Sequence, residues 1–138
     1  MAAIKFYSTT IDCRSPEVLA RFYAALLGWE VVYCDGTFAC VGAPGQVQGG
    51  YPGLSFQREP AYQPPVWPTD RAHPQQMAHL DFAVDDLEEA VRQAVACGAV
   101  QASQQFSEGW RVMLDPEGHP FCLCAMGEMM RSAQFALR

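Results

Sequence analysis

The spacing of hydrophobic residues along this chain changes from the period of a β-strand to that of an α-helix and back again, and this order occurs twice. Residues 4–13 alternate with the period of two that is typical of a β-strand. Residues 16–27 then place apolar side chains at helical spacing, after Ser15, which suits an N-cap, and before Gly28, which suits a left-handed helix end. Three short segments follow that we expect to be strands: 29–33, 37–41 and 54–58.

The second half of the chain repeats this order. Residues 77–84 alternate as a strand, and Asp85 or Asp86 precedes a helical stripe of apolar residues that ends at Gly98. Residues 115–118, Asp-Pro-Glu-Gly, favour a turn. The other elements that we expect in this half are strands at 100–104, 110–114 and 121–126 and a short helix within 128–138.

The repeated order predicts an α+β fold built from two βαβββ modules. Module one spans about 4–58, module two about 76–126, and the proline-rich segment 59–75 between them favours neither helix nor strand. A length of 138 residues suits a single domain. The helices should cover one face of an open, curved mixed sheet, whose other face should surround a cleft.

The strand alternation also predicts which side chains face the cleft. Leu80 and Phe82 should pack on the second helix, so that His79 and Asp81 point to the opposite face. Large apolar Trp67, in the proline-rich segment, should either plug the end of the core or line the cleft. The candidate ligand-binding residues are Ser8, Thr10, Gln57, Trp67, His79, Asp81, Arg111, Cys122 and Cys124.

Composition and charge restrict the classes of partner. Half of the residues are hydrophobic, no apolar run reaches the length of a membrane span, and the N-terminus lacks the apolar core of a signal peptide. We therefore expect a globular cytoplasmic protein with no membrane partner. The net charge of -6 disfavours nucleic acid and suits a small neutral or cationic ligand.

The six cysteines do not form a Cys-x-x-Cys pair, and most lie in apolar segments. That placement predicts buried or half-buried free thiols rather than a disulfide framework. The sequence also lacks a glycine-rich phosphate loop, a Gly-x-Ser-x-Gly motif and a dinucleotide-binding fingerprint. These absences disfavour the corresponding nucleotide-dependent and serine-hydrolase activities.

Three segments resemble the glyoxalase, bleomycin-resistance and extradiol-dioxygenase superfamily, also called vicinal oxygen chelate proteins. They are the Phe-Tyr to Leu-Gly helix end at 22–30, the His-Leu-Asp-Phe strand opening at 79–87 and the Asp-Pro-x-Gly hairpin at 115–121. The most similar branch is the glyoxalase-like domain. The resemblance implies paired βαβββ modules around a cleft, and a homodimer, which would also cover the edges of an open sheet.

The superfamily's enzymes bind a divalent metal through two histidines, or a histidine and a glutamine, from the first strands and a carboxylate from a last strand. Ser8 and His79 are equivalent, because each lies the same number of residues before its helix start. Cys122 stands at the position of the superfamily's carboxylate ligand, and the corresponding position in module one is near Gln57. Only His79 is a clear ligand type at a ligand position. We therefore expect no metal cofactor, with a divalent metal as the alternative, since His and Cys together suit zinc.

Three functions remain open from the sequence. The one that we favour is a cytoplasmic small-molecule binder with a degenerate metal site, as the resemblance to metal-independent bleomycin-resistance proteins implies. The second is a metal-dependent lyase, isomerase or dioxygenase acting on a small oxygenated substrate, and the third is an interaction module whose cleft is filled by side chains.

Two features of the predicted cleft bear on an enzymatic function. Cys122 beside His79 would resemble a nucleophilic pair, although a Cys on a strand is more often a small packing residue. Asp12 or Asp81 could act as a general base if buried, or could instead pair with Arg111 or be hydrated. The sequence leaves these alternatives open, and it assigns no catalytic residue.

Overall fold

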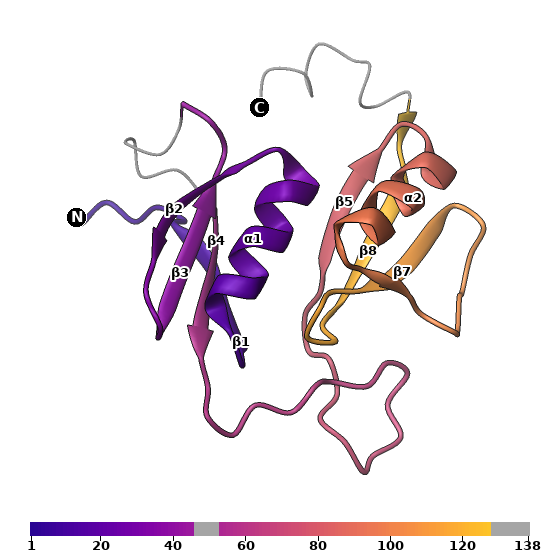
Figure 1. Ribbon diagram of the computed structural model, residues 1–138, viewed down its shortest axis with the longest axis horizontal. Helices are drawn as coiled ribbons and strands as arrows, with labels where there is room; N and C mark the ends of the chain where they lie inside the picture. Colours follow the sequence, from indigo (N-terminus) through magenta and orange to yellow (C-terminus); the bar gives the residue numbers. More distant parts are fainter. Residues whose placement is uncertain (46–52, 128–138) are drawn as a thin grey trace. The chain divides into compact units, whose positions relative to one another are not determined.

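The chain forms two compact units, Met1–Tyr62 and Gln63–Arg138, each of which carries one β-α-β-β-β module (Figure 1). The computed structural model describes residues 1–45 and 53–127. The helix predicted within 128–138 therefore lies outside the described residues. Within the described ranges, no helix combines the length and apolar character that crossing a membrane requires.

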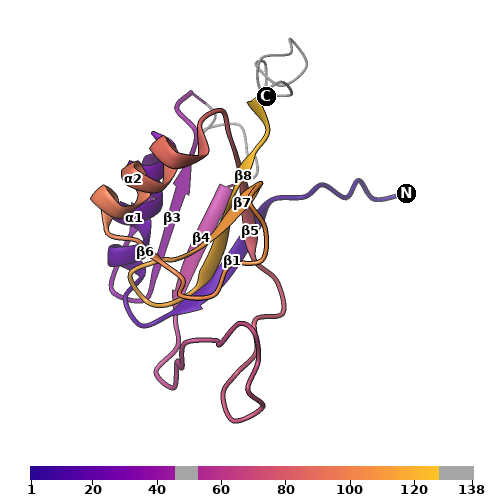
Figure 2. The ribbon, with the colours of Figure 1, turned by 90° about the vertical axis from the view of Figure 1, so that its right-hand side faces the viewer.

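Module one folds as a four-stranded mixed sheet with one helix on it (Figure 2). The strand order is β1-β4-β3-β2, in which β1 pairs parallel with β4 and the other neighbours pair antiparallel. The helix packs on β2, β3 and β4. The elements of this module are β1 (Ser8–Cys13), α1 (Pro16–Leu27), β2 (Glu30–Cys34), β3 (Phe38–Gly42) and β4 (Gly53–Arg58).

The local signals at α1 act as the sequence predicts. The Ser15 hydroxyl accepts a hydrogen bond from the backbone N–H of Val18, and Gly28 ends the helix with φ 65°. The stripe that this helix presents to the sheet is fully buried at Leu19 and Tyr23, and the Tyr23 ring stacks on Phe56 of β4 at 5.5 Å. Burial of such side chains stabilises the module by about 2 kcal/mol each.

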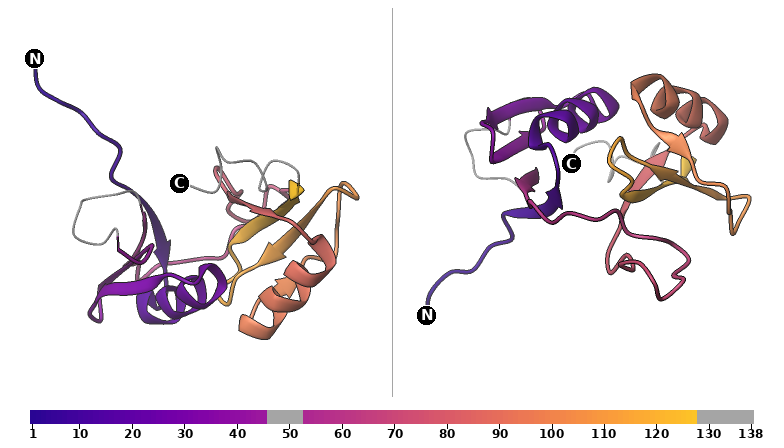
Figure 3. Two further views of the ribbon diagram at one scale, coloured as in Figure 1. Left: turned by 90° about the horizontal axis from the view of Figure 1, so that it is seen from above. Right: turned by 60° about the horizontal axis from the view of Figure 1, so that its bottom comes forward.

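Module two has the same architecture (Figure 3). Its strand order is β5-β8-β7-β6, with β5 parallel to β8, and α2 packs on β6, β7 and β8. Asp86 caps α2 by accepting from the N–H of Glu89, and Gly98 ends it with φ 117°. The elements are β5 (Leu80–Val84), α2 (Leu87–Cys97), β6 (Val100–Gln101), β7 (Trp110–Leu114) and β8 (Pro120–Ala125).

The strand starts differ from the predictions. β1 begins at Ser8 and not at Ile4, because its pairing with β4 starts opposite Gly53, and the preceding residues 1–7 run away from the sheet (Figure 2). Likewise β5 begins at Leu80 and not at Met77, with its pairing to β8 starting opposite Phe121. Alternation alone extends a strand beyond the point where hydrogen-bonding partners are present.

The two faces of the module-two sheet have different roles. The backbone register places Phe82 beside Leu123, on the side where Phe121 and Met113 are buried against α2. Asp81, Ala83, Cys122, Cys124, Val112 and Trp110 therefore share the opposite side, which we call the free face of module two. The alternation argument is confirmed for this module.

Candidate functional site

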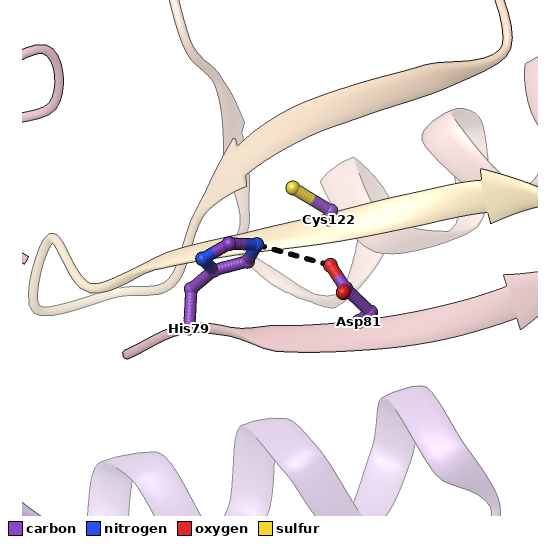
Figure 4. A group of neighbouring side chains, drawn as sticks. All are labelled: His79, Asp81 and Cys122. Atoms are coloured by element: carbon purple, nitrogen blue, oxygen red, sulfur yellow. Dashed lines mark ion pairs between the residues drawn. The ribbon is translucent and has the colours of Figure 1, made fainter. Parts of the chain in front are cut away.

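Three side chains with different donor atoms converge on the free face of module two (Figure 4). Asp81 of β5 and Cys122 of β8 are register partners in the parallel pair, and His79 lies two residues before Asp81. The ligand-type atoms of the three residues lie within 4.8 Å of one another, and His79 Nε2 is 3.1 Å from Asp81 Oδ1. The sequence predicted all three positions and their shared face.

The environment of Cys122 keeps its thiol protonated. The residue is 1% exposed, and burial, followed by the negative charge of Asp81 and the neighbouring Cys124, raises the pKa of the thiol to about 12. A hydrogen bond to the Asp81 carboxylate acts in the same direction. Since the thiolate is the reactive form, the raised pKa of the thiol argues against Cys122 as a nucleophile activated by His79.

An aromatic cluster adjoins these donors and consists of Trp67, His79, Phe106 and Trp110. The ring centroid of Trp67 lies 4.8 Å from that of His79, 5.3 Å from Phe106 and 6.4 Å from Trp110. Phe106 in turn stacks with Trp110 at 5.7 Å. Trp67 thus packs against the candidate site rather than at the end of the hydrophobic core, and Phe106 remains 43% exposed.

The sequence analysis missed Phe106 and Trp110. Trp110 could have been found, because β7 alternates and its register pairs Trp110 with Cys124 on the free face. Phe106 lies outside the named strands and helices, between β6 and β7, where no period indicates which way a side chain points.

Arg111 does not lie with the other candidates. Its backbone pairs with Leu123, and its guanidinium is 3.1 Å from the carboxylate of Glu88 in α2. The same guanidinium donates to the backbone carbonyls of Ser107 and Glu108. Arg111 therefore pairs with Glu88 and not with Asp81, because its position in β7 directs it to the helix side.

The candidates of module one form a separate polar row along β1 and β4. Ser8 Oγ lies 2.8 Å from Ser55 Oγ, and Gln57 Nε2 donates to Asp12 at 2.9 Å. The register pairs Thr10 with Ser55, as it pairs Asp81 with Cys122 in module two. Ser55, and not Gln57, is therefore the module-one counterpart of Cys122.

The remaining histidines bond to carboxylates of their own loops. Exposed His73 Nδ1 lies 2.7 Å from the carboxylate of Asp70. The His119 ring nitrogen Nδ1 lies 2.8 Å from the buried Asp115 carboxylate. Asp115 also accepts from the backbone N–H of Glu117 and of His119, so this cluster stabilises the β7–β8 turn.

All six cysteines are free thiols, as predicted. Five of them are buried or partly buried. Cys34 differs because it is exposed, at the end of β2, where every residue of the strand is exposed. The apolar residues around Cys34 in the sequence predicted burial. The prediction is wrong for Cys34 because β2 lies at an edge of its sheet, which the sequence pattern does not show.

The sequence profile of the glyoxalase-like domain matches residues 8–124. The chain belongs to the glyoxalase-like domain family. The match begins at the first residue of β1 and ends within β8, so it covers both modules of this glyoxalase-like protein. No curated protein matches the chain.

Solved structures of the superfamily have a similar fold. A glyoxalase/bleomycin resistance protein/dioxygenase family enzyme from Burkholderia phytofirmans is 20% identical, with a TM-score of 0.59 over 85% of this chain and 94% of that one. Glyoxalase I of Leishmania major is 19% identical, with a TM-score of 0.59 over 98% and 96%. A bleomycin resistance determinant encoded on the transposon Tn5 is 20% identical, with a TM-score of 0.56 over 88% and 97%.

The residues of module two fit a divalent metal of the kind that the superfamily's enzymes bind. Imidazole nitrogen, carboxylate oxygen and thiolate sulfur are all zinc ligands, and the group offers one nitrogen, one oxygen and the sulfur of Cys122, whose proton a bound metal would displace. Asp81 supplies the carboxylate from β5, whereas the superfamily pattern takes its carboxylate from a last strand. The glyoxalase-like domain thus carries a donor set that differs from the family pattern.

Proposed function

We propose that this glyoxalase-like protein binds a small molecule on the free face of module two. The observation that carries the proposal is the packing of Trp67 on His79 while His79 bonds to Asp81. Aromatic surface and an ionisable pair thus lie next to each other. Ligand sites commonly combine such apolar walls with a few placed polar groups.

The same residues suggest the class of ligand. The Asp81 side chain is 62% exposed and has acceptor oxygens that can take a hydrogen bond or a positive charge. Trp67, Phe106 and Trp110 offer ring faces to a flat or cationic group. Together with the net charge of -6, this favours a cationic aromatic compound over an anion.

We also propose that the protein is a cytoplasmic homodimer. Supporting this, module one exposes apolar side chains on the edge strand β2, among them Val31, Val32 and Tyr33. An edge strand with exposed apolar side chains favours pairing with another chain. The mass of the protein in solution, measured by light scattering, would test the dimer.

Calorimetric titration with cationic and anionic aromatic compounds of similar size tests the ligand site. The cationic compounds should bind, and Trp67→Ala should weaken their binding about tenfold or more, since aromatic anchors dominate such sites. Trp29→Ala removes a tryptophan outside the aromatic cluster and should leave the dissociation constant unchanged. Equal affinity of the Trp67→Ala variant and the parent protein would contradict the proposal, as would a panel without any binder.

A second candidate function is a metal-dependent lyase, isomerase or dioxygenase. The observation in its favour is the convergence of His79, Asp81 and Cys122. A metal held there would act as a Lewis acid on oxygens of a bound substrate. In this function Trp67 and its neighbours would orient the substrate, and turnover that depends on added metal would distinguish it from simple binding.

A further inference from the structure

We infer that His79, Asp81 and Cys122 form a zinc-type metal site that lies within module two alone. This inference goes beyond small-molecule binding, and it holds or fails independently of it. It assigns Nε2 of His79, a carboxylate oxygen of Asp81 and Sγ of Cys122 as the three protein ligands.

The distances suit one metal ion. Bonds of about 2.0–2.3 Å in a tetrahedral zinc site place neighbouring ligand atoms roughly 3.2–3.8 Å apart. His79 Nε2 and Asp81 Oδ1 are 3.1 Å apart, and all three ligand atoms lie within 4.8 Å of one another. Side-chain rotations that bring the ligand atoms about 1 Å closer together would therefore close the group around an ion, and the backbone of the sheet would not have to move.

The donor atoms select the kind of metal. Magnesium and calcium prefer sites made of oxygen ligands, whereas a thiolate with an imidazole suits zinc and, as its spectroscopic substitute, cobalt. The group contains one nitrogen, one oxygen and one sulfur ligand. Zinc should therefore bind here much more tightly than magnesium.

The scaffold holds two of the ligands in fixed register. Asp81 and Cys122 face each other across the parallel β5–β8 pair, and β8 also pairs with β7 on its other side. Trp67 packs on the His79 ring at 4.8 Å with a tilt of 31°, which restricts the rotation of the imidazole. Such supporting contacts orient a metal ligand before the ion arrives.

The site has a buried side and an open side. Cys122 is 1% exposed, whereas the side chains of His79 and Asp81 are 26% and 62% exposed. A metal bound by these three ligands would keep a position on the Asp81 side for water or a small ligand. Three protein ligands with one open position are typical of catalytic zinc sites.

The corresponding place in module one has no such ligands. There the positions of His79, Asp81 and Cys122 are taken by Ser8, Thr10 and Ser55, and the two serine hydroxyls bond each other. Hydroxyl groups are poor zinc ligands compared with imidazole, carboxylate and thiolate. Among the described residues, this donor set thus lies in one of the two modules.

Cobalt titration of untagged full-length protein, stripped of metal with a chelator, tests the inference. We expect one equivalent of cobalt to bind with a thiolate-to-cobalt charge-transfer absorption in the near ultraviolet, and zinc to remove that absorption by displacing cobalt. Cys122→Ser should abolish the charge-transfer absorption. Cys124→Ser, which changes the next thiol on the same face, should retain it.

Asp81→Asn provides a second test, at the most exposed of the three ligands, where the side chain keeps its size. Its carboxamide is a weaker ligand, so the dissociation constant for cobalt should rise about tenfold or more. Circular dichroism of each metal-free variant checks the fold. A parent protein without charge-transfer absorption at saturating cobalt would overturn the inference, and so would absorption that survives in Cys122→Ser or unchanged affinity in Asp81→Asn.

Discussion

At the scale of single residues, the environment of Cys122 decides how the thiol titrates. Its neighbours are the carboxylate of Asp81, the thiol of Cys124 and the packed interior of β8, and all of them favour the neutral form. Cys34, at the end of β2, is exposed and is not enclosed by neighbouring side chains as Cys122 is. The thiols of Cys122 and Cys34 thus differ in accessibility because β8 is an inner strand of its sheet and β2 is an edge strand.

The raised pKa of Cys122 gives the protein a stability that depends on pH. In the folded state the pKa is about 12, above the ordinary value of 9.0, so the neutral thiol stabilises the fold fully below pH 9.0. That contribution is lost as the pH rises from about 9 toward 12. Thermal unfolding of metal-free protein should therefore show a midpoint that falls across this range.

Cys122→Ala is the matched variant for this pH dependence, because it removes the titrating group and keeps a small apolar side chain. Its unfolding midpoint should fall less steeply between pH 9 and pH 11 than that of the parent protein. Cys34→Ala, at an exposed thiol, should follow the parent curve. Parallel curves for the parent protein and Cys122→Ala would show that Cys122 does not titrate as described.

At the scale of the elements, β4 fits its neighbours closely at its first residue. Gly53 pairs with Ser8 of β1, and a Cβ atom at Gly53 would lie 2.4 Å from the carbonyl oxygen of Val41 in β3. A backbone oxygen has no rotamer through which to withdraw. Only glycine fits there without a shift of the strand, which is a known reason for glycine inside a sheet.

Gly53→Ala should therefore destabilise the protein by about 1–3 kcal/mol, the usual cost of overpacking. Urea denaturation followed by tryptophan fluorescence measures this difference. Gly36→Ala is the control, because a Cβ there meets no atom within 4 Å and the free energy of unfolding should change by less than about 0.5 kcal/mol. Equal stability of the two variants would contradict the close packing of β3 and β4.

The elements themselves could be predicted because local chemistry defines their ends. Ser15 and Asp86 cap the helices, Gly28 and Gly98 end them, and the alternation of residues 79–84 places His79 and Asp81 on one face. The aromatic cluster could not be predicted in the same way. Trp67 and Phe106 come from segments without a period, and only tertiary packing brings them to His79.

At the scale of the whole molecule, two modules share one backbone plan and differ in their chemistry. Both sheets pair their first and last strands in parallel and place one helix on one face. The equivalent positions hold Ser8, Thr10 and Ser55 in module one but His79, Asp81 and Cys122 in module two. Fold similarity therefore does not carry the ligand set from one module to the other.

This asymmetry predicts how metal binding responds to changes in module one. The superfamily pattern draws ligands from the first strands of both modules, so a site of that kind should weaken when the Ser8 position changes. A site made by His79, Asp81 and Cys122 should not. Cobalt affinity of Ser8→Ala should then remain within about twofold of the parent value, since changes at sites without shared partners add independently.

The same titration on Ser55→Ala extends the test to the partner of Ser8, whose hydroxyl lies 2.8 Å away. Both variants should retain the charge-transfer absorption that Cys122→Ser loses. A tenfold or larger loss of cobalt affinity in either serine variant, with the fold intact by circular dichroism, would mean that module one supplies a ligand. The metal site would then follow the two-module pattern of the superfamily rather than the single-module arrangement inferred from the donor distances.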